Sequence, residues 1–183
     1  MAKVDGFGLD PDFAKSLSDL LDWCSENGMD FRVSQGLRTP QVQAQYYCQW
    51  DQRSAAAVQQ AADNLRQRGA PWLASLLETD KDEPRKPQWL TDALPGAGWH
   101  QWGLAADCYC YRDGKMVTSG DDPVYKRYAD KAQELGMRAG YYFHKRDAGH
   151  VQGSLDDDAT KSHSWPEIDD IMKQRFSGKP AVS

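Results

Sequence analysis

The sequence predicts an α+β fold, and three features of its 183 residues indicate this class. Stretches in which apolar residues keep helical spacing are interleaved with short stretches that alternate in polarity, as strands do. The strand-like stretches come in pairs joined by turns, which favours a small antiparallel sheet flanked by helices over a parallel doubly wound sheet. A hydrophobic content of 40% suits a globular chain, and the length suits one domain over residues 1–183.

The N-terminal part predicts a helix, a strand and a second helix. Residues 10–28, "DPDFAKSLSDLLDWCSENG", begin with a capping aspartate and a proline at the first helical position, and they end on a glycine. Residues 31–38 alternate like a short strand. A proline then opens a helix over residues 40–53. These signals set the order helix, strand, helix.

The middle of the chain predicts an insertion of helices and loop over residues 51–98. Residues 54–78 have helical character with a break at Gly69–Pro71. Residues 79–98 hold three prolines and many charges, which indicates a surface loop. Because this loop leads directly to His100, we expect it to border a functional site.

The C-terminal part supplies the remaining strands. Residues 103–117 predict a hairpin that turns at Asp113–Gly114. An amphipathic helix is expected over residues 121–136, and a strand pair follows across 138–153. Residues 165–183 form a C-terminal helix, over 165–176, and a tail.

Charge and hydropathy exclude some classes of function. The net charge of −5, without a basic stripe, argues against nucleic-acid binding. The first residues lack the apolar core of a secretory signal, and no stretch is long enough for a membrane span. We therefore expect synthesis in the cytoplasm without a signal peptide, and no membrane insertion.

The four cysteines do not have the C-x-x-C spacing of metal or redox motifs. Cys108 and Cys110 alternate with Asp107, so on a strand both thiols face away from that carboxylate. We expect them to be buried and to behave as apolar residues. A disulfide between Cys24 and Cys48 is left open.

Two motifs bring together residues that can bind a metal. "GWHQWGLAADCYC" places His100 and Asp107 seven positions apart, and "DAGHVQ" holds Asp147 and His150. Seven extended residues span roughly 23 Å, so the first two side chains meet only if the chain folds back. Gly103 permits such a bend. His150 would then supply a third ligand from a separate strand.

Two histidines and one carboxylate leave the fourth position of a zinc ion open, which is the catalytic arrangement. Asp147 would then act as general base toward the attacking water, the usual logic of metal-assisted peptide hydrolysis. The residues alone leave the alternative that all four are ordinary polar side chains with satisfied partners.

Three stretches resemble the motifs of a known family. "HQWGLAAD" resembles H-x-x-G-x-A-x-D, "DAGH" resembles D/E-x-x-H, and "SQGLRTPQVQAQYY" resembles an upstream motif with an arginine before a glutamine-bearing helix. These motifs belong to the zinc D-Ala-D-Ala carboxypeptidases and L-alanyl-D-glutamate peptidases, which include VanY-like enzymes and phage endolysins. The resemblance covers about residues 30–153 in the order of the family.

The resemblance implies a Hedgehog/DD-peptidase-like fold with the zinc site at the sheet. By this resemblance, we expect one Zn2+ per chain, held by His100, Asp107 and His150, with Asp147 as the catalytic base. Arg38 is expected to stabilise the oxyanion or to bind a substrate carboxylate. The alternative for Arg38 is a surface arginine that caps the next helix.

Three further residues are candidates for substrate binding. Gln43 is expected to join Arg38, with a solvent-facing side chain as the alternative. His144 is a candidate hydrogen-bond donor to the tetrahedral intermediate, although plain exposure is the preferred interpretation. Trp99 is expected to pack, and lining a glycopeptide groove is its second interpretation.

The sequence departs from the family pattern at three places. Gly98 stands where the family often has a serine, the segment 51–98 is longer than a minimal member needs, and the base position holds aspartate rather than glutamate. An aspartate base is more similar to the phage endopeptidases than to the dipeptidases.

The resemblance thus implies a zinc-dependent peptidase of the peptidoglycan stem peptide, with L-Ala-D-Glu as the expected bond. The alternatives are a D,D-carboxypeptidase or endopeptidase of the same family, and a non-catalytic, zinc-containing wall-binding module. The expected place of action is the cell wall in the periplasm, reached by holin-mediated release of an endolysin or by secretion of a toxin effector. Delivery machinery or an immunity protein would then be a partner.

Overall fold

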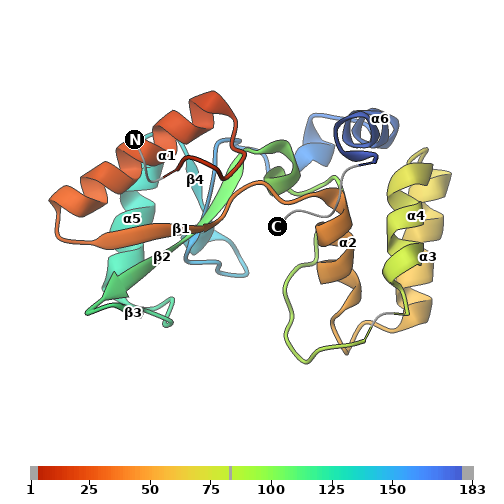
Figure 1. Cartoon of the computed structure of the whole chain (residues 1–183), viewed down its shortest axis with the longest axis horizontal. Coiled ribbons are helices and arrows are strands. Elements are labelled where there is room, and N and C mark those ends of the chain that lie inside the picture. The colour runs from red at the N-terminus through yellow and green to blue at the C-terminus, as the bar shows by residue number, and fades with distance from the viewer. Residues whose placement is uncertain (1–3, 83, 179–183) are drawn as a thin grey trace. The chain divides into compact units, whose positions relative to one another are not determined.

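The structure is a computed structural model that describes residues 4–82 and 84–178, and it has the expected α+β class (Figure 1). The chain folds as two compact units. One consists of the residues up to Leu37 together with Trp102–Leu155, and the other of Arg38–Gln101 together with the residues from Asp156 onward. The expected domain over residues 1–183 therefore contains two such units.

The first unit is built on an antiparallel sheet in which the strands have the order β1-β2-β5-β4, with β3 paired to β2. The strands are β1 (Asp30–Gln35), β2 (Ala105–Arg112), β3 (Lys115–Met116), β4 (Arg138–Ala139) and β5 (His150–Gln152). The predicted hairpin and the predicted strand pair are both confirmed. The hairpin turns where predicted, because Asp113 and Gly114 both have positive φ, 53° and 74°.

One face of this sheet is covered by α1 (Pro11–Glu26) and α5 (Pro123–Glu134) (Figure 1). The core includes apolar residues from both helices and from alternate positions of the strands: Leu17, Leu20, Tyr128, Phe31, Ala106, Cys108 and Val151. The Phe31 and Tyr128 rings stack with centroids 4.3 Å apart. Since strand residues alternate between faces, Asp107 and His150 belong to the face opposite this core.

The ends of α1 follow from its sequence. The Asp10 carboxylate accepts hydrogen bonds from the backbone N–H groups of Asp12 at 3.0 Å and Phe13 at 3.3 Å, which caps the helix. Gly28 follows the helix with φ of +73°, a conformation that glycine adopts without strain. The predicted helix is therefore confirmed.

The second unit is helical and contains α2 (Pro40–Cys48), α3 (Ala55–Gln67), α4 (Pro71–Asp80) and α6 (Trp165–Phe176). The helices α3 and α4 pack side by side and are separated at the predicted break, where Gly69 has φ of +85° (Figure 1). The first residues of α4 lack a local side-chain cap. Instead, the Asp169 carboxylate of α6 accepts hydrogen bonds from the N–H groups of Leu73 at 2.8 Å and Trp72 at 3.3 Å.

Several predicted bounds need correction. The strand expected over 31–38 ends at Gln35, and the helix expected over 40–53 ends at Cys48. The segment 79–98 is only partly a surface loop, because Thr91, Gly96 and Ala97 are buried. Gly96 packs so closely that a Cβ atom there would lie 2.6 Å from a methyl carbon of Ile168. Residue 83 and the tail residues 179–183 lie outside the described residues.

All four cysteines are buried and none of them forms a disulfide, so the pairing of Cys24 with Cys48 that the sequence leaves open is absent. Burial raises the pKa of Cys48 and of Cys108 to about 12. Both thiols therefore stay protonated and unreactive near neutral pH. Cys108 lies in the core, on the face away from Asp107, as predicted.

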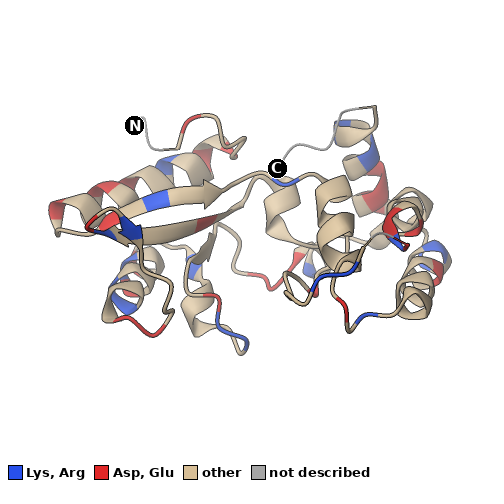
Figure 2. Cartoon of the chain, turned by 60° about the horizontal axis from the view of Figure 1, so that its bottom comes forward, with Lys and Arg blue, Asp and Glu red and all other residues tan. Residues whose placement is uncertain are grey.

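Charges of both signs are mixed along the helices (Figure 2). Lys15 pairs with Asp19 on α1, and Lys126 pairs with Asp130 on α5, each one helical turn apart. Such faces do not form a basic stripe for a phosphate backbone. In the part of the chain that the structure describes, none of the helices has the length and apolar character needed to cross a membrane.

Candidate metal centre

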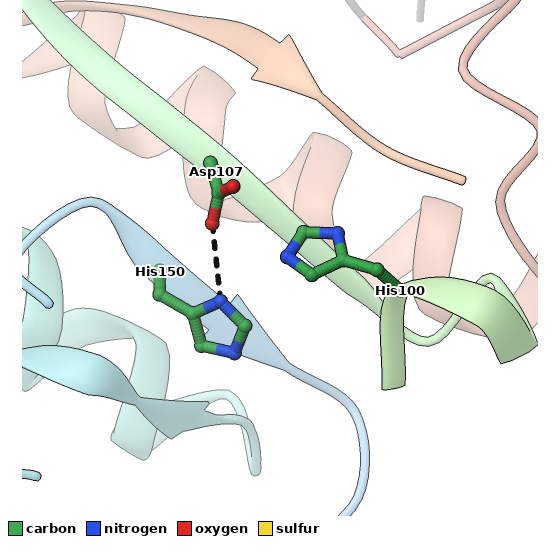
Figure 3. Close-up of side chains that lie close together, drawn as sticks. All are labelled: His100, Asp107 and His150. Carbon is green, nitrogen blue, oxygen red and sulfur yellow. Dashed lines mark hydrogen bonds and ion pairs between the residues drawn. The ribbon is translucent and has the colours of Figure 1, made fainter. Parts of the chain in front are cut away.

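The register of β2 and β5 brings Asp107 and His150 together. The two residues are direct partners in this antiparallel pair, next to the partners Ala106 and Val151. Directly opposite residues project their side chains from the same face at about 5 Å. The His150 Nδ1 atom accordingly lies 3.1 Å from Asp107 Oδ1 (Figure 3).

His100 reaches the cluster through a short 3-10 helix, Trp99–Trp102, and the bend that follows it. Gly103 has φ of +78°, and a Cβ atom there would lie 3.0 Å from the carbonyl oxygen of Gly8. The predicted bend at Gly103 is therefore present, and glycine suits it for both reasons. His100 is buried, and its carbonyl oxygen accepts a hydrogen bond of 3.2 Å from the Arg38 N–H.

His100, Asp107 and His150 fit a metal ion. Each offers one ligand atom, and these atoms all lie within 4.8 Å of one another (Figure 3). Zinc holds nitrogen and oxygen ligands at about 2 Å, so its tetrahedral ligands are separated by roughly 3–4 Å and only a small closure is required. Two imidazoles and one carboxylate are a donor set that zinc prefers, and they leave a fourth position open.

The cluster also attracts positive charge. Burial lowers the pKa of His150, but the hydrogen bond and the negative charge of Asp107, together with the charge of Asp147, outweigh it and raise the pKa above its usual value. A proton or a metal cation is therefore favoured at this position.

Asp147 lies in the turn before β5 and is held by backbone hydrogen bonds. Its N–H donates to the Gly140 carbonyl oxygen at 2.9 Å, and its own carbonyl accepts from the His150 N–H at 3.1 Å. Gly140 leaves no space for a side chain, because a Cβ atom there would lie 2.4 Å from the Asp147 carbonyl oxygen. The carboxylate of Asp147 is exposed and is close enough to act electrostatically on His150.

Arg38 is buried, with 8% of its surface exposed, and is not a surface arginine. Its Nη1 donates to Gln43 Oε1 at 2.9 Å, and its guanidinium lies over the Tyr46 ring, 4.9 Å from the centroid. The structure therefore joins Arg38 and Gln43, as expected. The solvent-facing alternative for Gln43 is wrong, because this side chain is almost completely buried.

Gln101 and Thr91, which no sequence motif singles out, complete a buried polar network around Gln43. The Gln43 amide nitrogen donates to Thr91 Oγ1 at 3.0 Å and to the Ala93 carbonyl at 2.8 Å. Gln101 donates to Gln43 Oε1 at 3.2 Å. A neutral amide next to His100 carries no sequence signal that distinguishes it from the other glutamines of this chain.

The other two substrate-binding candidates differ in exposure. His144 is exposed in the segment between β4 and β5. Trp99 is buried, and its indole N–H donates to the Asp156 carbonyl at 3.0 Å, so packing accounts for its position.

Gln152 is a further site residue that no sequence motif singles out. It follows His150 by two residues on the same strand, and its Oε1 lies 3.2 Å from His150 Nε2.

Two sheet residues, Asp107 and His150, meet His100 of the 3-10 helix, and a further carboxylate lies in the adjoining turn. This is the composition of a metal-dependent hydrolase. Residues 6–154 match the VanY family, described as D-alanyl-D-alanine carboxypeptidase. Because the match covers most of the chain, the protein belongs to this family of zinc peptidases, which act on peptide bonds of peptidoglycan. No curated protein matches the chain.

Solved structures resemble the chain at low identity. The L-Ala D-Glu endopeptidase ChiX of Serratia marcescens is 16% identical, with 84% of this chain and 88% of that chain covered and a TM-score of 0.45. A mutant of the vancomycin resistance D,D-pentapeptidase VanY, in complex with Zn(II), is 20% identical, with 87% and 83% covered and a TM-score of 0.46. The LD-carboxypeptidase LdcB is 18% identical, with 95% and 71% covered and a TM-score of 0.45.

Proposed function

We propose that this protein hydrolyses the L-Ala-D-Glu bond of the peptidoglycan stem peptide, with His100, Asp107 and His150 as its zinc ligands. The observation that carries the proposal is the convergence of these three donor atoms within 4.8 Å, with Asp147 in the turn that leads to His150. All four positions hold residue types that are competent for the chemistry. A non-catalytic wall-binding module would not require them.

The reaction needs a base, and Asp147 is the proposed one. Bound zinc would supply a Lewis acid that polarises the scissile carbonyl and lowers the pKa of water. The Asp147 carboxylate accepts the proton of the attacking water and delivers it to the departing amine. Its exposure lets water and substrate reach it, while the hydrogen bonds to Gly140 and from His150 fix the backbone that carries it.

Arg38 is proposed to stabilise negative charge on the substrate, either on the developing oxyanion or on a carboxylate. Two observations support this role. The guanidinium is held by Gln43 and by the face of Tyr46, so its orientation is fixed before substrate binds. The Arg38 backbone is also hydrogen-bonded to that of His100, which ties the arginine to one of the proposed ligands.

Two bonds are candidates. The aspartate in "DAGH" favours the L-Ala-D-Glu bond, because the resemblance to phage endopeptidases rests on this residue. The description of the VanY family favours a D,D bond at the end of the stem or in a cross-link, which is the second candidate.

Mass spectrometry of muropeptides distinguishes these functions. Purified peptidoglycan is digested with the zinc-loaded protein, and the fragments are compared with those from a digest with chelator. Cleavage after L-Ala leaves muramyl-L-Ala and frees peptides that begin with D-Glu, which is the expected result. Release of D-Ala or loss of cross-links would assign the D,D bond instead. An unchanged muropeptide profile would contradict hydrolysis and favour the binding module.

The route to the wall is part of the proposal. The substrate places the site of action at the cell wall in the periplasm, and holin-mediated release or a secretion system would deliver the chain. The net charge of −5 slightly favours a secreted effector, since an anionic wall does not attract an anionic enzyme over distance. An immunity protein in the producing cell would then be expected.

A further inference from the structure

Gln152 is a buried polar residue of β5 that the proposed mechanism does not use. It lies two positions after His150, so both side chains project from the same face of the strand. Only 2% of its surface is exposed. Its amide Nε2 donates to the Ser154 carbonyl oxygen at 2.9 Å, and its Oε1 lies 3.2 Å from His150 Nε2.

The contact with Ser154 fixes the direction of the amide. A backbone carbonyl oxygen only accepts hydrogen bonds, so the NH2 group of Gln152 must face Ser154. The amide oxygen then faces His150, and this oxygen also only accepts. The hydrogen in the contact between Gln152 and His150 is therefore carried by His150 Nε2.

This assignment determines the state of the other ring nitrogen. A neutral imidazole carries one hydrogen, so with Nε2 protonated the Nδ1 atom presents a lone pair. That lone pair points at Asp107 Oδ1, 3.1 Å away, which is also an acceptor. The two atoms are compatible when Nδ1 carries the second proton of an imidazolium, or when a metal ion takes the place of that proton. In the other tautomer, Nδ1–H would donate to Asp107 and could not bind a metal.

We propose that Gln152 is a positioning residue that holds His150 in the Nε2–H tautomer and so makes Nδ1 the metal-binding atom. This inference rests on the proposed function, because it takes His150 to be a zinc ligand. The Ser154 carbonyl contributes to this arrangement, because its hydrogen bond keeps the NH2 group of Gln152 from turning toward the imidazole. Partners of this kind behind a ligating histidine typically change metal affinity 10- to 100-fold when removed.

Two substitutions at this position separate acceptor chemistry from packing. Gln152→Met keeps the length of the side chain and has no strong acceptor, so zinc affinity measured by competition with a chelator should fall roughly 10- to 100-fold. Gln152→Glu keeps an oxygen acceptor for Nε2–H and should bind zinc within a few-fold of the unmodified protein. Gln133→Met, at an exposed position of α5, is the matched control and should not change affinity.

Long-range 15N–1H NMR of the unmodified, zinc-loaded protein reads the tautomer directly and does not depend on the folding of a variant. The expected spectrum shows His150 with a protonated Nε2 and a metal-bound Nδ1. A metal-bound Nε2, or unchanged zinc affinity in a folded Gln152→Met variant, would overturn the role of Gln152 and leave the proposed function standing. A failure of the unmodified protein to bind zinc would overturn the proposed function and this inference with it.

Discussion

The carboxylate of Asp147 is exposed, whereas the candidate ligands His100, Asp107 and His150 lie in more enclosed positions. Its backbone is fixed by Gly140, yet its side chain is in contact with solvent. The exposure of Asp147 suits a base that exchanges protons with water, whereas the enclosed positions of the other three suit metal ligands.

Asp147→Asn tests this separation. The amide cannot accept a proton from the attacking water, so hydrolysis of peptidoglycan should fall by orders of magnitude. Zinc content should remain nearly unchanged, because the three ligands are intact. Activity and bound zinc are measured on the same preparation.

Asp147→Glu is the matched control and should recover part of the activity, since it keeps a carboxylate with a slightly longer reach. If Asp147→Asn lost zinc as severely as His150→Ala, the carboxylate would be a ligand instead of a base. His144, six residues before His150, would then be the first candidate for the base.

Arg38→Ala should lower activity by roughly 10²- to 10³-fold, the usual effect of removing a group that stabilises the oxyanion. The protein should keep its zinc. Gln43 loses one buried partner, so the free energy of unfolding should also fall by about 1–2 kcal/mol. Near-normal turnover in a folded variant would assign Arg38 a purely structural role, as the anchor of the Gln43 network.

At the residue scale, the sequence predicts the charged and ionisable members of the site better than the neutral ones. His100, Asp107 and His150 are found from motif spacing, and the bend that unites them is found from Gly103. The glutamines at 43, 101 and 152 are buried and hydrogen-bonded. Polar composition alone suggests a solvent-facing side chain for each, because only tertiary packing decides where an uncharged amide is buried.

At the scale of elements, the starts of helices are the most predictable feature, because capping residues and prolines act locally. The capping aspartate of α1, the break before α4 and the bounds of α6 all follow from short-range signals. Strand register does not, since pairing of Asp107 with His150 depends on contacts across 43 residues of chain. The buried end of the 79–98 segment was missed for the same reason, because Gly96 packs against α6 and α4.

The cap that α6 provides for α4 is the basis of an element-scale prediction. Asp169→Ala removes a buried acceptor from two backbone N–H groups at the first turn of α4, so the free energy of unfolding should fall by about 1–3 kcal/mol. Urea unfolding measures the change. Asp170→Ala, an exposed position of the same helix, should change stability little. Equal losses in both variants would show that the helix, and not the cap, is affected.

At the scale of the whole molecule, the family match ends before α6. Residues 6–154 match VanY, whereas α6 covers Trp165–Phe176. The Asp169 cap nevertheless makes α6 part of the same compact unit as α3 and α4. Segment 51–98 and the C-terminal helix both lie outside the sequence motifs. They stabilise each other through the contact between Asp169 and the start of α4.

Zinc titration of the metal-free protein, with hydrolysis of purified peptidoglycan as the readout, tests the central claim most directly. The protein is stripped with chelator, zinc is added in known ratios, and product formation is followed at each ratio. Activity should be absent without metal and should rise linearly to a plateau at about one zinc per chain, because three ligands and one open position define a single catalytic site. Hydrolysis by the metal-free protein, or none at any zinc ratio, would contradict the assignment of this protein as a zinc-dependent peptidoglycan peptidase.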